Sequence, residues 1–269
     1  MENKQKKILV ITDVDGTIVP KAADISLENL KAAQEIIHAN MLLTVATGRC
    51  VNATREIHKK LKANVPAILY NGSCIYDYAQ EKCLFVEYQP STVADVIAKV
   101  AEKYKDCGIL MADLSCYYMV KEDKYLDWFF EDFNIKPSAV KPQDCVNMLK
   151  VVITCDKEKS QEICEFLNGI VGEDLKVVCS AEMFVEILPK AVSKGAALLK
   201  LVEIINVRME DVFAIGDYYN DLEILEIAGY SVAMAHAPEV IKKLCKYVVE
   251  NVDKSLVDVL SIVERKYGN

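Results

Sequence analysis

The chain has 269 residues, of which 52% are hydrophobic, and it carries a formal net charge of −8. This length and apolar content suffice for one large domain or for two smaller ones, each with its own core. The acidic balance argues against a protein that binds nucleic acid, because such proteins present a basic surface to the phosphate backbone.

The ten cysteines and the N-terminal segment indicate the cellular compartment of the protein. The cysteines form no CxxC pair, and most lie in apolar periodic segments, where a free thiol behaves as a small hydrophobe. The opening MENKQKK is charged, and the apolar run after it is too short for a signal peptide. No stretch approaches the length of an apolar membrane-spanning helix. We therefore expect a cytoplasmic protein in a reducing compartment, with no membrane partner.

The first third of the chain alternates between strand-like and helix-like segments. The pattern predicts, in order, a buried strand at 8–11, a helix at 26–40, a strand at 42–46, a helix at 51–61 and a strand at 67–70. Such a βαβαβ order predicts a parallel sheet with helices on both faces. In parallel sheets of this kind, ligands bind at the carboxyl ends of the strands.

The order of predicted helices and strands changes in the middle of the chain. Helices predicted at 92–104, 124–133 and 157–167 are interleaved with strands around 108–120, 149–155, 176–180 and 183–189. Paired short strands between helices indicate an α+β unit with an antiparallel sheet.

The alternation of strands and helices that predicts a parallel sheet then resumes and continues to the end of the chain. It predicts helices at 194–205, 220–228 and 238–245, strands at 211–217, 230–235 and 247–250, and a final helix. We therefore predict an α/β fold: a Rossmann-like three-layer core with a mainly parallel sheet, formed by residues 1–82 and 188–269, and an α+β domain inserted at residues 83–187.

Polar residues gather where the predicted parallel strands end. They are Asp13 and Asp15, then Thr47-Gly48-Arg49, then Asn71-Gly72-Ser73, then Asp217, Asn220 and Asp221, with Lys194 at the start of a helix. Carboxylate oxygens are the ligands that Mg²⁺ prefers. An ammonium group, a hydroxyl and glycine-freed backbone amides bind phosphoryl oxygens. The sequence therefore predicts a site for a phosphate group and a hard cation.

These residues belong to four motifs that occur in order: DVDGT, ATGR, VSKGAALL with its Lys194, and GDYYND. With these four motifs the chain resembles a phosphatase of the haloacid dehalogenase superfamily. Within that superfamily it resembles the Cof-type branch, which carries a large α+β cap. The first motif alone would be a weak signal, whereas four in order are specific. The resemblance covers essentially the whole chain and implies that the inserted domain is the cap.

The resemblance also implies a mechanism: Mg²⁺-dependent hydrolysis of a small phosphorylated metabolite, such as a sugar phosphate, through an aspartyl-phosphate. Asp13 would be the nucleophile and Asp15 the acid and base. Mg²⁺ would be held by Asp13, the backbone carbonyl of Asp15, Asp217 and, directly or through water, Asp221. The groups that bind the phosphoryl oxygens would be Thr47, Gly48, Lys194 and Asn220, of which Thr47 and Lys194 would also act in catalysis.

Several alternatives stay open. A phosphomutase would return the phosphoryl group to its substrate, and a catalytically silent protein would only bind a phosphometabolite, although binding alone does not require Asp15. Arg49 would either reach the substrate or pair with an acid. Asn71 is favoured as a turn residue, and Asn220 as a helix cap rather than a phosphate ligand. His236 stands where the family more often has Asn and is a candidate for tuning the site. We expect a monomer or a weak dimer.

Overall fold

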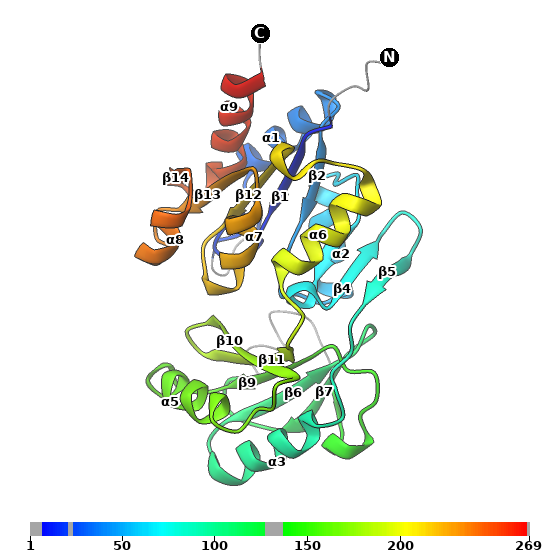
Figure 1. Ribbon diagram of the computed structural model, residues 1–269, viewed down its shortest axis with the longest axis vertical. Helices are drawn as coiled ribbons and strands as arrows, with labels where there is room; N and C mark the ends of the chain where they lie inside the picture. Colours follow the sequence, from blue (N-terminus) through cyan, green and yellow to red (C-terminus); the bar gives the residue numbers. More distant parts are fainter. Residues whose placement is uncertain (1–6, 21–23, 127–136, 268–269) are drawn as a thin grey trace.

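The computed structural model describes residues 7–20, 24–126 and 137–267. Figure 1 shows two units, one above the other, with both termini on the upper one. We call the upper unit the core and the lower unit, from α3 (Val93–Lys103) through β11 (Phe184–Pro189), the cap. Most of the helix predicted at 124–133 lies outside the described residues.

The core contains a parallel sheet whose strand order in the described residues is β14-β13-β12-β1-β2. These strands are β1 (Leu9–Thr12), β2 (Leu42–Val45), β12 (Val212–Gly216), β13 (Tyr230–Met234) and β14 (Tyr247–Val249). β1 pairs with β2 on one side and with β12 on the other. Its residues are all buried, as expected for a parallel strand with helices on both faces.

Helices cover both faces of this sheet. One face is covered by α1 (Leu27–His38), α2 (Val51–Lys60) and α9 (Ser255–Tyr267), and the other by α6 (Lys194–Ile205), α7 (Leu222–Ile227) and α8 (Glu239–Leu244). Val10 belongs to the hydrophobic cluster of the first set, whereas Leu9 and Ile11 belong to that of the second. Successive strand residues point to opposite faces, so the predicted three-layer α/β core is confirmed.

The third strand predicted for the parallel sheet instead belongs to another sheet. β3 (Ala67–Leu69) pairs antiparallel with β4 (Cys74–Asp77), which pairs with β5 (Lys82–Val86). Within the described residues, a single bridge from Ala46 to Ile68 links β3 to the parallel sheet.

The turn after β3 accounts for its antiparallel partner. Tyr70, Asn71 and Gly72 have φ angles of 52°, 55° and 107°. L-residues rarely adopt this left-handed region, and three such residues in succession reverse the chain. The reversal sends β4 back alongside β3, so the strand predicted to include Tyr70 stops at Leu69.

The cap has a sheet with the order β10-β11-β9-β6-β7-β8. Besides β11, its strands are β6 (Gly108–Ala112), β7 (Tyr117–Lys121), β8 (Ser138–Ala139), β9 (Lys150–Thr154) and β10 (Leu175–Ala181). All the pairings are antiparallel except that of β7 with β8. The predicted antiparallel sheet is therefore confirmed.

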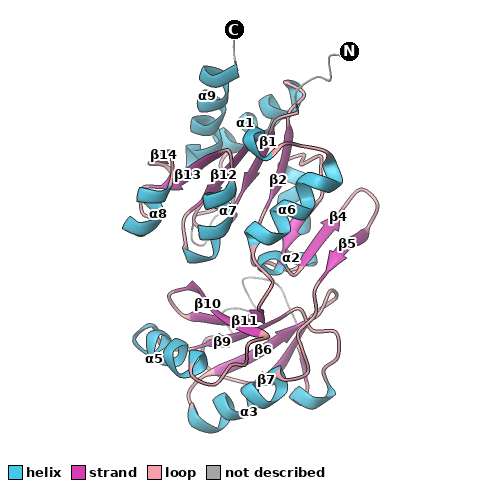
Figure 2. Ribbon diagram, viewed as in Figure 1, coloured by secondary structure: helices cyan, strands magenta, loops and turns pink. Residues whose placement is uncertain are grey.

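The two faces of the cap sheet have different neighbours. α3 and α5 (Lys157–Asn168) pack with Ile109 and Ile153 on the face away from the core (Figure 2). Leu110 and Val152 share a hydrophobic cluster with Tyr70 of the core. The cap sheet thus lies between its own helices and the core.

One pair of cysteines is joined. A disulfide links Cys164 of α5 to Cys179 of β10, and the other eight cysteines are free. The cysteine spacing did not predict this pair, because only the fold brings the two elements together. None of the helices in the described ranges combines the length and apolar character needed to cross a membrane.

Candidate active site

The polar residues predicted to converge do so at the carboxyl edge of the parallel sheet, facing the cap. Asp13 follows β1, and its N–H continues the ladder by donating to the carbonyl of Ile215, 2.9 Å away. Thr47 lies just beyond β2, and its N–H donates to the carbonyl of Ile68 at 2.9 Å. Asp217 directly follows β12. Rigid strands therefore present each of these groups, as expected for a parallel sheet.

Lys194 lies at the centre of the site. It is the first residue of α6, and its side chain is fully buried. Its Nζ donates to Asp13 Oδ1 and to Asp221 Oδ1, each 2.6 Å away. Burial alone would lower the pKa of Lys194, but the two carboxylates outweigh it and raise that pKa above its ordinary value. The two carboxylates therefore favour the charged form of Lys194, which contacts Asp13.

The two carboxylates that contact Lys194 lie close to a third, that of Asp217. Ligand oxygens of Asp13, Asp217 and Asp221 all lie within 4.8 Å of one another. Burial raises the pKa of Asp13 well above its usual range, and Asp221 and Asp217 add to the rise while Lys194 opposes it. Burial likewise raises the pKa of Asp221. When ionised, three carboxylates carry more negative charge than the one ammonium group of Lys194 neutralises, and three oxygen donors at this spacing fit a hard divalent cation.

Asp217 is held in place by neighbours from other elements. Thr17 Oγ1 donates to Asp217 Oδ1 at 3.1 Å, and His236 Nε2 lies 3.1 Å from Asp217 Oδ2. Gly16 has a φ of 83°, and a Cβ at that position would lie 2.5 Å from Asp217 Oδ2. Glycine is therefore required at residue 16 both for its backbone conformation and for the space that Asp217 occupies.

Asp15 lies apart from the three-carboxylate cluster. Its side chain is exposed and forms a two-point ion pair with Arg49, in which Arg49 Nε donates to Asp15 Oδ2 at 2.9 Å. This fork-to-carboxylate geometry is the one that arginine favours. Of the two alternatives for Arg49, the structure shows the pairing with an acid.

The turn after β2 is held from two sides. The N–H of Arg49 donates to Thr47 Oγ1 at 3.1 Å, and the N–H of Asn71 donates to the carbonyl of Thr47 at 3.0 Å. A Cβ at Gly48 would lie 3.1 Å from Asn71 Oδ1. Asn71 does have a turn conformation, but the turn interpretation was incomplete because the residue is buried against the predicted phosphate-binding turn.

The interpretation of Asn220 as a helix cap is wrong. The residue lies in a short 3₁₀ turn (Tyr219–Asp221), and Asp221 takes the N-cap position of α7. The side chain of Asn220 points instead to Asn71, whose Oδ1 accepts a hydrogen bond from it at 3.1 Å. Asn220 therefore joins the loop after β12 to the turn after β3.

Two cap residues reach this region, and motif reasoning missed both. Lys150 Nζ, from β9, donates to the carbonyl of Gly48 at 2.8 Å and lies 3.1 Å from Glu186 Oε1 of β11. Glu186 Oε2 in turn accepts a hydrogen bond from Asn71 Nδ2 at 2.7 Å. Each charge stands inside an otherwise apolar strand segment, which is the signal that could have singled them out.

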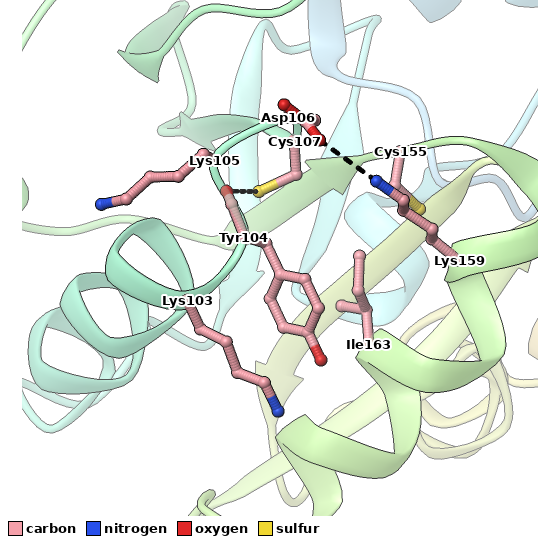
Figure 3. A pocket seen from close by; sticks show the side chains of 8 residues that line it. All are labelled: Lys103, Tyr104, Lys105, Asp106, Cys107, Cys155, Lys159 and Ile163. Carbon is pink, nitrogen blue, oxygen red and sulfur yellow. Dashed lines mark hydrogen bonds and ion pairs between the residues drawn. The ribbon is translucent and has the colours of Figure 1, made fainter.

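Of two small cavities, one adjoins the candidate site and the other does not. One, of about 40 Å³, lies between core and cap and is lined in part by Asn71, Ser193 and Asn220. The other, of about 90 Å³, lies within the cap between the end of α3 and α5 (Figure 3). Its Lys159 pairs with Asp106 at 3.2 Å, and Lys103 lies over the ring of Phe166. No motif residue lines this second cavity, so we do not connect it with the chemistry.

The arrangement of strand-end acids around a buried lysine can be compared with known proteins. A family model of haloacid dehalogenase-like hydrolases matches residues 10–260. The chain belongs to this family. A curated relative from Bacillus subtilis, 5-amino-6-(5-phospho-D-ribitylamino)uracil phosphatase YwtE, is 28% identical, with 91% of this chain and 94% of the relative covered.

Two solved structures from the comparison share the fold over nearly their whole length. A haloacid dehalogenase-like hydrolase from Bacteroides thetaiotaomicron gives a TM-score of 0.83 at 25% identity, covering 97% of this chain and 100% of that one. TM0651 from Thermotoga maritima gives 0.78 at 27% identity, covering 95% and 97%. The prediction of a phosphatase of the haloacid dehalogenase family is confirmed.

Proposed function

We propose that this phosphatase requires Mg²⁺ and hydrolyses a small phosphorylated metabolite through an aspartyl-phosphate. The observation that carries the proposal is the buried cluster in which Asp13 contacts Lys194 and has ligand oxygens of Asp217 and Asp221 within 4.8 Å of its own. A carboxylate is a good in-line nucleophile toward phosphorus only when the repulsion between the two anions is neutralised.

The donor set fits the cation that the family implies. Asp13, Asp217 and Asp221 would hold it, together with the backbone carbonyl of Asp15, and all of these are the oxygen ligands that Mg²⁺ prefers. When bound, Mg²⁺ would supply positive charge that offsets the repulsion of the nucleophile and the phosphoryl group. Thr17 and His236 would orient Asp217 within that set.

In the first step, an oxygen of Asp13 forms a bond to phosphorus while the bond from phosphorus to the leaving oxygen breaks. Lys194, Thr47, the Gly48 turn and Asn220 would hold the phosphoryl oxygens through the planar transition state. Asp15 would give its proton to the leaving alkoxide. To do so, its carboxyl group must first take up a proton from solvent and turn from Arg49 toward the leaving oxygen, since both of its oxygens now form an ion pair with Arg49.

In the second step, water attacks the phosphorus of the aspartyl-phosphate. Asp15, deprotonated by the first step, takes a proton from the attacking water, the bond from phosphorus to Asp13 breaks, and phosphate leaves. Both carboxylates return to their starting state. A phosphomutase would differ only in the acceptor, since the phosphoryl group would pass back to the substrate.

The inserted domain, predicted at residues 83–187, is proposed to close over Asp13 and to shape the pocket for the leaving group. Both chain crossings, after β5 and after β11, lead toward the strand ends that carry the motifs (Figure 1). A domain placed there can exclude water from the reaction. Cytoplasmic location, a monomer or weak dimer, and the absence of nucleic-acid and membrane partners stay predictions.

The experiment is a time course of phosphate release from 4-nitrophenyl phosphate by the purified chain. We expect release with Mg²⁺, none after removal of metal with EDTA, and little recovery with Ca²⁺, which is larger and geometrically more permissive. Full activity after rigorous chelation would contradict the metal requirement. Tight binding of phosphorylated compounds without phosphate release would favour the silent binding protein instead.

A panel of phosphorylated metabolites then narrows the substrate class. Sugar phosphates belong in it, together with 5-amino-6-(5-phospho-D-ribitylamino)uracil, the compound named for the Bacillus subtilis relative. Following the organic product as well as phosphate separates hydrolysis from a mutase reaction, because a mutase yields an isomeric phosphate ester. The Asp13→Asn protein, prepared in the same way, is the control for a contaminating phosphatase.

A further inference from the structure

We propose that Lys150 and Glu186 of the cap are positioning residues that orient the hydroxyl of Thr47 when the cap is closed on the core. The proposal rests on the role of Thr47 in binding the phosphoryl group, as given under the proposed function. It adds a device by which the cap completes the phosphate-binding turn of the core.

The contact from Lys150 fixes one peptide plane of that turn. The carbonyl of Gly48, which accepts a hydrogen bond from Lys150 Nζ at 2.8 Å, belongs to the peptide that joins Gly48 to Arg49. The N–H of the same peptide donates to Thr47 Oγ1 at 3.1 Å. Because a peptide unit is planar, holding its carbonyl also directs its N–H.

This peptide plane determines which partner the hydroxyl proton of Thr47 can have. A hydroxyl has one proton to donate and two lone pairs that accept. One lone pair of Thr47 Oγ1 is engaged by the N–H of Arg49. The hydroxyl proton is thereby left for an acceptor such as a phosphoryl oxygen, and the direction of the hydroxyl depends on the peptide that Lys150 holds.

Glu186 steadies the other side of the same turn. Its Oε2 accepts a hydrogen bond from Asn71 Nδ2 at 2.7 Å, and the N–H of Asn71 donates to the carbonyl of Thr47 at 3.0 Å. Lys150 therefore acts directly, and Glu186 acts through Asn71, on the two peptide groups on either side of Gly48. They are themselves joined at 3.1 Å, so the two supports form one unit.

The burial of this pair argues for a purpose other than stability. The side chains of Lys150 and Glu186 are each only 5% exposed. A buried ion pair usually stabilises a protein no better than apolar side chains of the same size would. The pair also reaches from the cap strands β9 and β11 to core residues, so these contacts exist only while cap and core are together.

The test is a double-mutant cycle between Lys150→Met and Thr47→Val in the full chain. The probes are the binding of orthovanadate in the presence of Mg²⁺ and the hydrolysis of 4-nitrophenyl phosphate. Each single variant should weaken orthovanadate binding and kcat/KM by about tenfold, the size of one hydrogen bond. If Lys150 acts through Thr47, the double variant should lose no more than Thr47→Val alone.

The cycle separates this inference from the proposed function. Orthovanadate binding and turnover by the wild-type protein test the function, whereas the comparison among variants tests the positioning role. Losses that multiply in the double variant, or unchanged orthovanadate binding in Lys150→Met, would overturn the inference even where the wild-type enzyme behaves as proposed.

Two further variants guard against a loss of folding. The double substitution Lys150→Met with Glu186→Gln removes both charges together, and it should give the wild-type circular dichroism spectrum while keeping the weakened orthovanadate binding. Lys176→Met is the matched control, because it removes another ion pair between cap and core, with Glu223 at 3.1 Å. It should leave orthovanadate binding unchanged, and a loss equal to that of Lys150→Met would contradict the proposal.

Discussion

Two groups of buried charges face the boundary between core and cap, and they differ in how their charges balance. In the core, Lys194 stands against the three carboxylates of Asp13, Asp217 and Asp221. In the cap, Lys150 stands against the single carboxylate of Glu186. An excess of buried charge calls for a ligand that neutralises it, whereas one cation facing one carboxylate has no net charge to neutralise. The first group is therefore suited to bind a cation, and the second to support the turn after β2.

The largest effect should come from Asp13→Asn, which removes the proposed nucleophile from the unbalanced group. Turnover should fall to background, by roughly 10⁶-fold if the loss matches that of other catalytic nucleophiles. Thermal unfolding should occur at the wild-type temperature or above it, because the change also removes excess buried negative charge. Retention of more than a few per cent of wild-type activity toward 4-nitrophenyl phosphate would contradict the assignment.

Asp15→Asn should have the next largest effect, since it removes an acid and base that lies outside both buried groups. We expect turnover of an alkyl phosphate to fall by roughly 10²–10⁴-fold, the usual contribution of a positioned acid or base. The loss should be smaller with 4-nitrophenyl phosphate, whose leaving group departs without a proton. Equal losses with the two substrates would argue against protonation of the leaving group by Asp15.

Lys150→Met tests the pair of Lys150 and Glu186 by its effect on the free energy of unfolding. Removing Lys150 takes away the cation that faces the buried carboxylate of Glu186, which should lower the free energy of unfolding by about 3–5 kcal/mol. Adding Glu186→Leu should recover most of that loss, because an apolar pair replaces the ionic one. Urea unfolding of the two variants measures both values. A double variant no more stable than Lys150→Met would show that the charges are not balanced against each other.

The smallest effect should come from Lys176→Met, at the exposed edge of the same boundary. The side chains of Lys176 and Glu223 are 19% and 55% exposed, and exposed ion pairs contribute only about 0–1 kcal/mol. Urea unfolding should therefore change by no more than that. A loss as large as that of Lys150→Met would remove the distinction between buried and exposed contacts at this boundary.

Much of the core could be predicted because its signals are local. An apolar run followed by acids located β1 and Asp13, and the motif residues Lys194, Asp217 and Asp221 stand where a parallel sheet must bring them together. The sheet partner of β3 could not be predicted, because it depends on three left-handed residues that the apolar pattern does not reveal.

The supporting contacts of the site could not be predicted for a different reason. Thr17 and Asp217 are 200 residues apart in the chain, Asn71 and Glu186 are 115 apart, and Lys150 and Gly48 are 102 apart. The first contact requires the finished core, and the other two also require the cap to be packed on it. A charge within an apolar strand, as at Lys150, marks a residue that needs a partner but does not identify that partner.

The pairing of β1 with β12 also bears on how the chain folds during synthesis. Leu9 has its partner at Val212, so one side of β1 stays an open edge until the ribosome has made the last third of the chain. The cap sheet is complete by Pro189 and is continuous in the sequence. Loop closure between distant residues is slow, and domains tend to fold as units once they are synthesised. The cap can therefore fold before the core that surrounds it in the sequence. A nascent chain halted so that Pro189 but not Val212 has left the ribosome should display a folded cap beside an incomplete core.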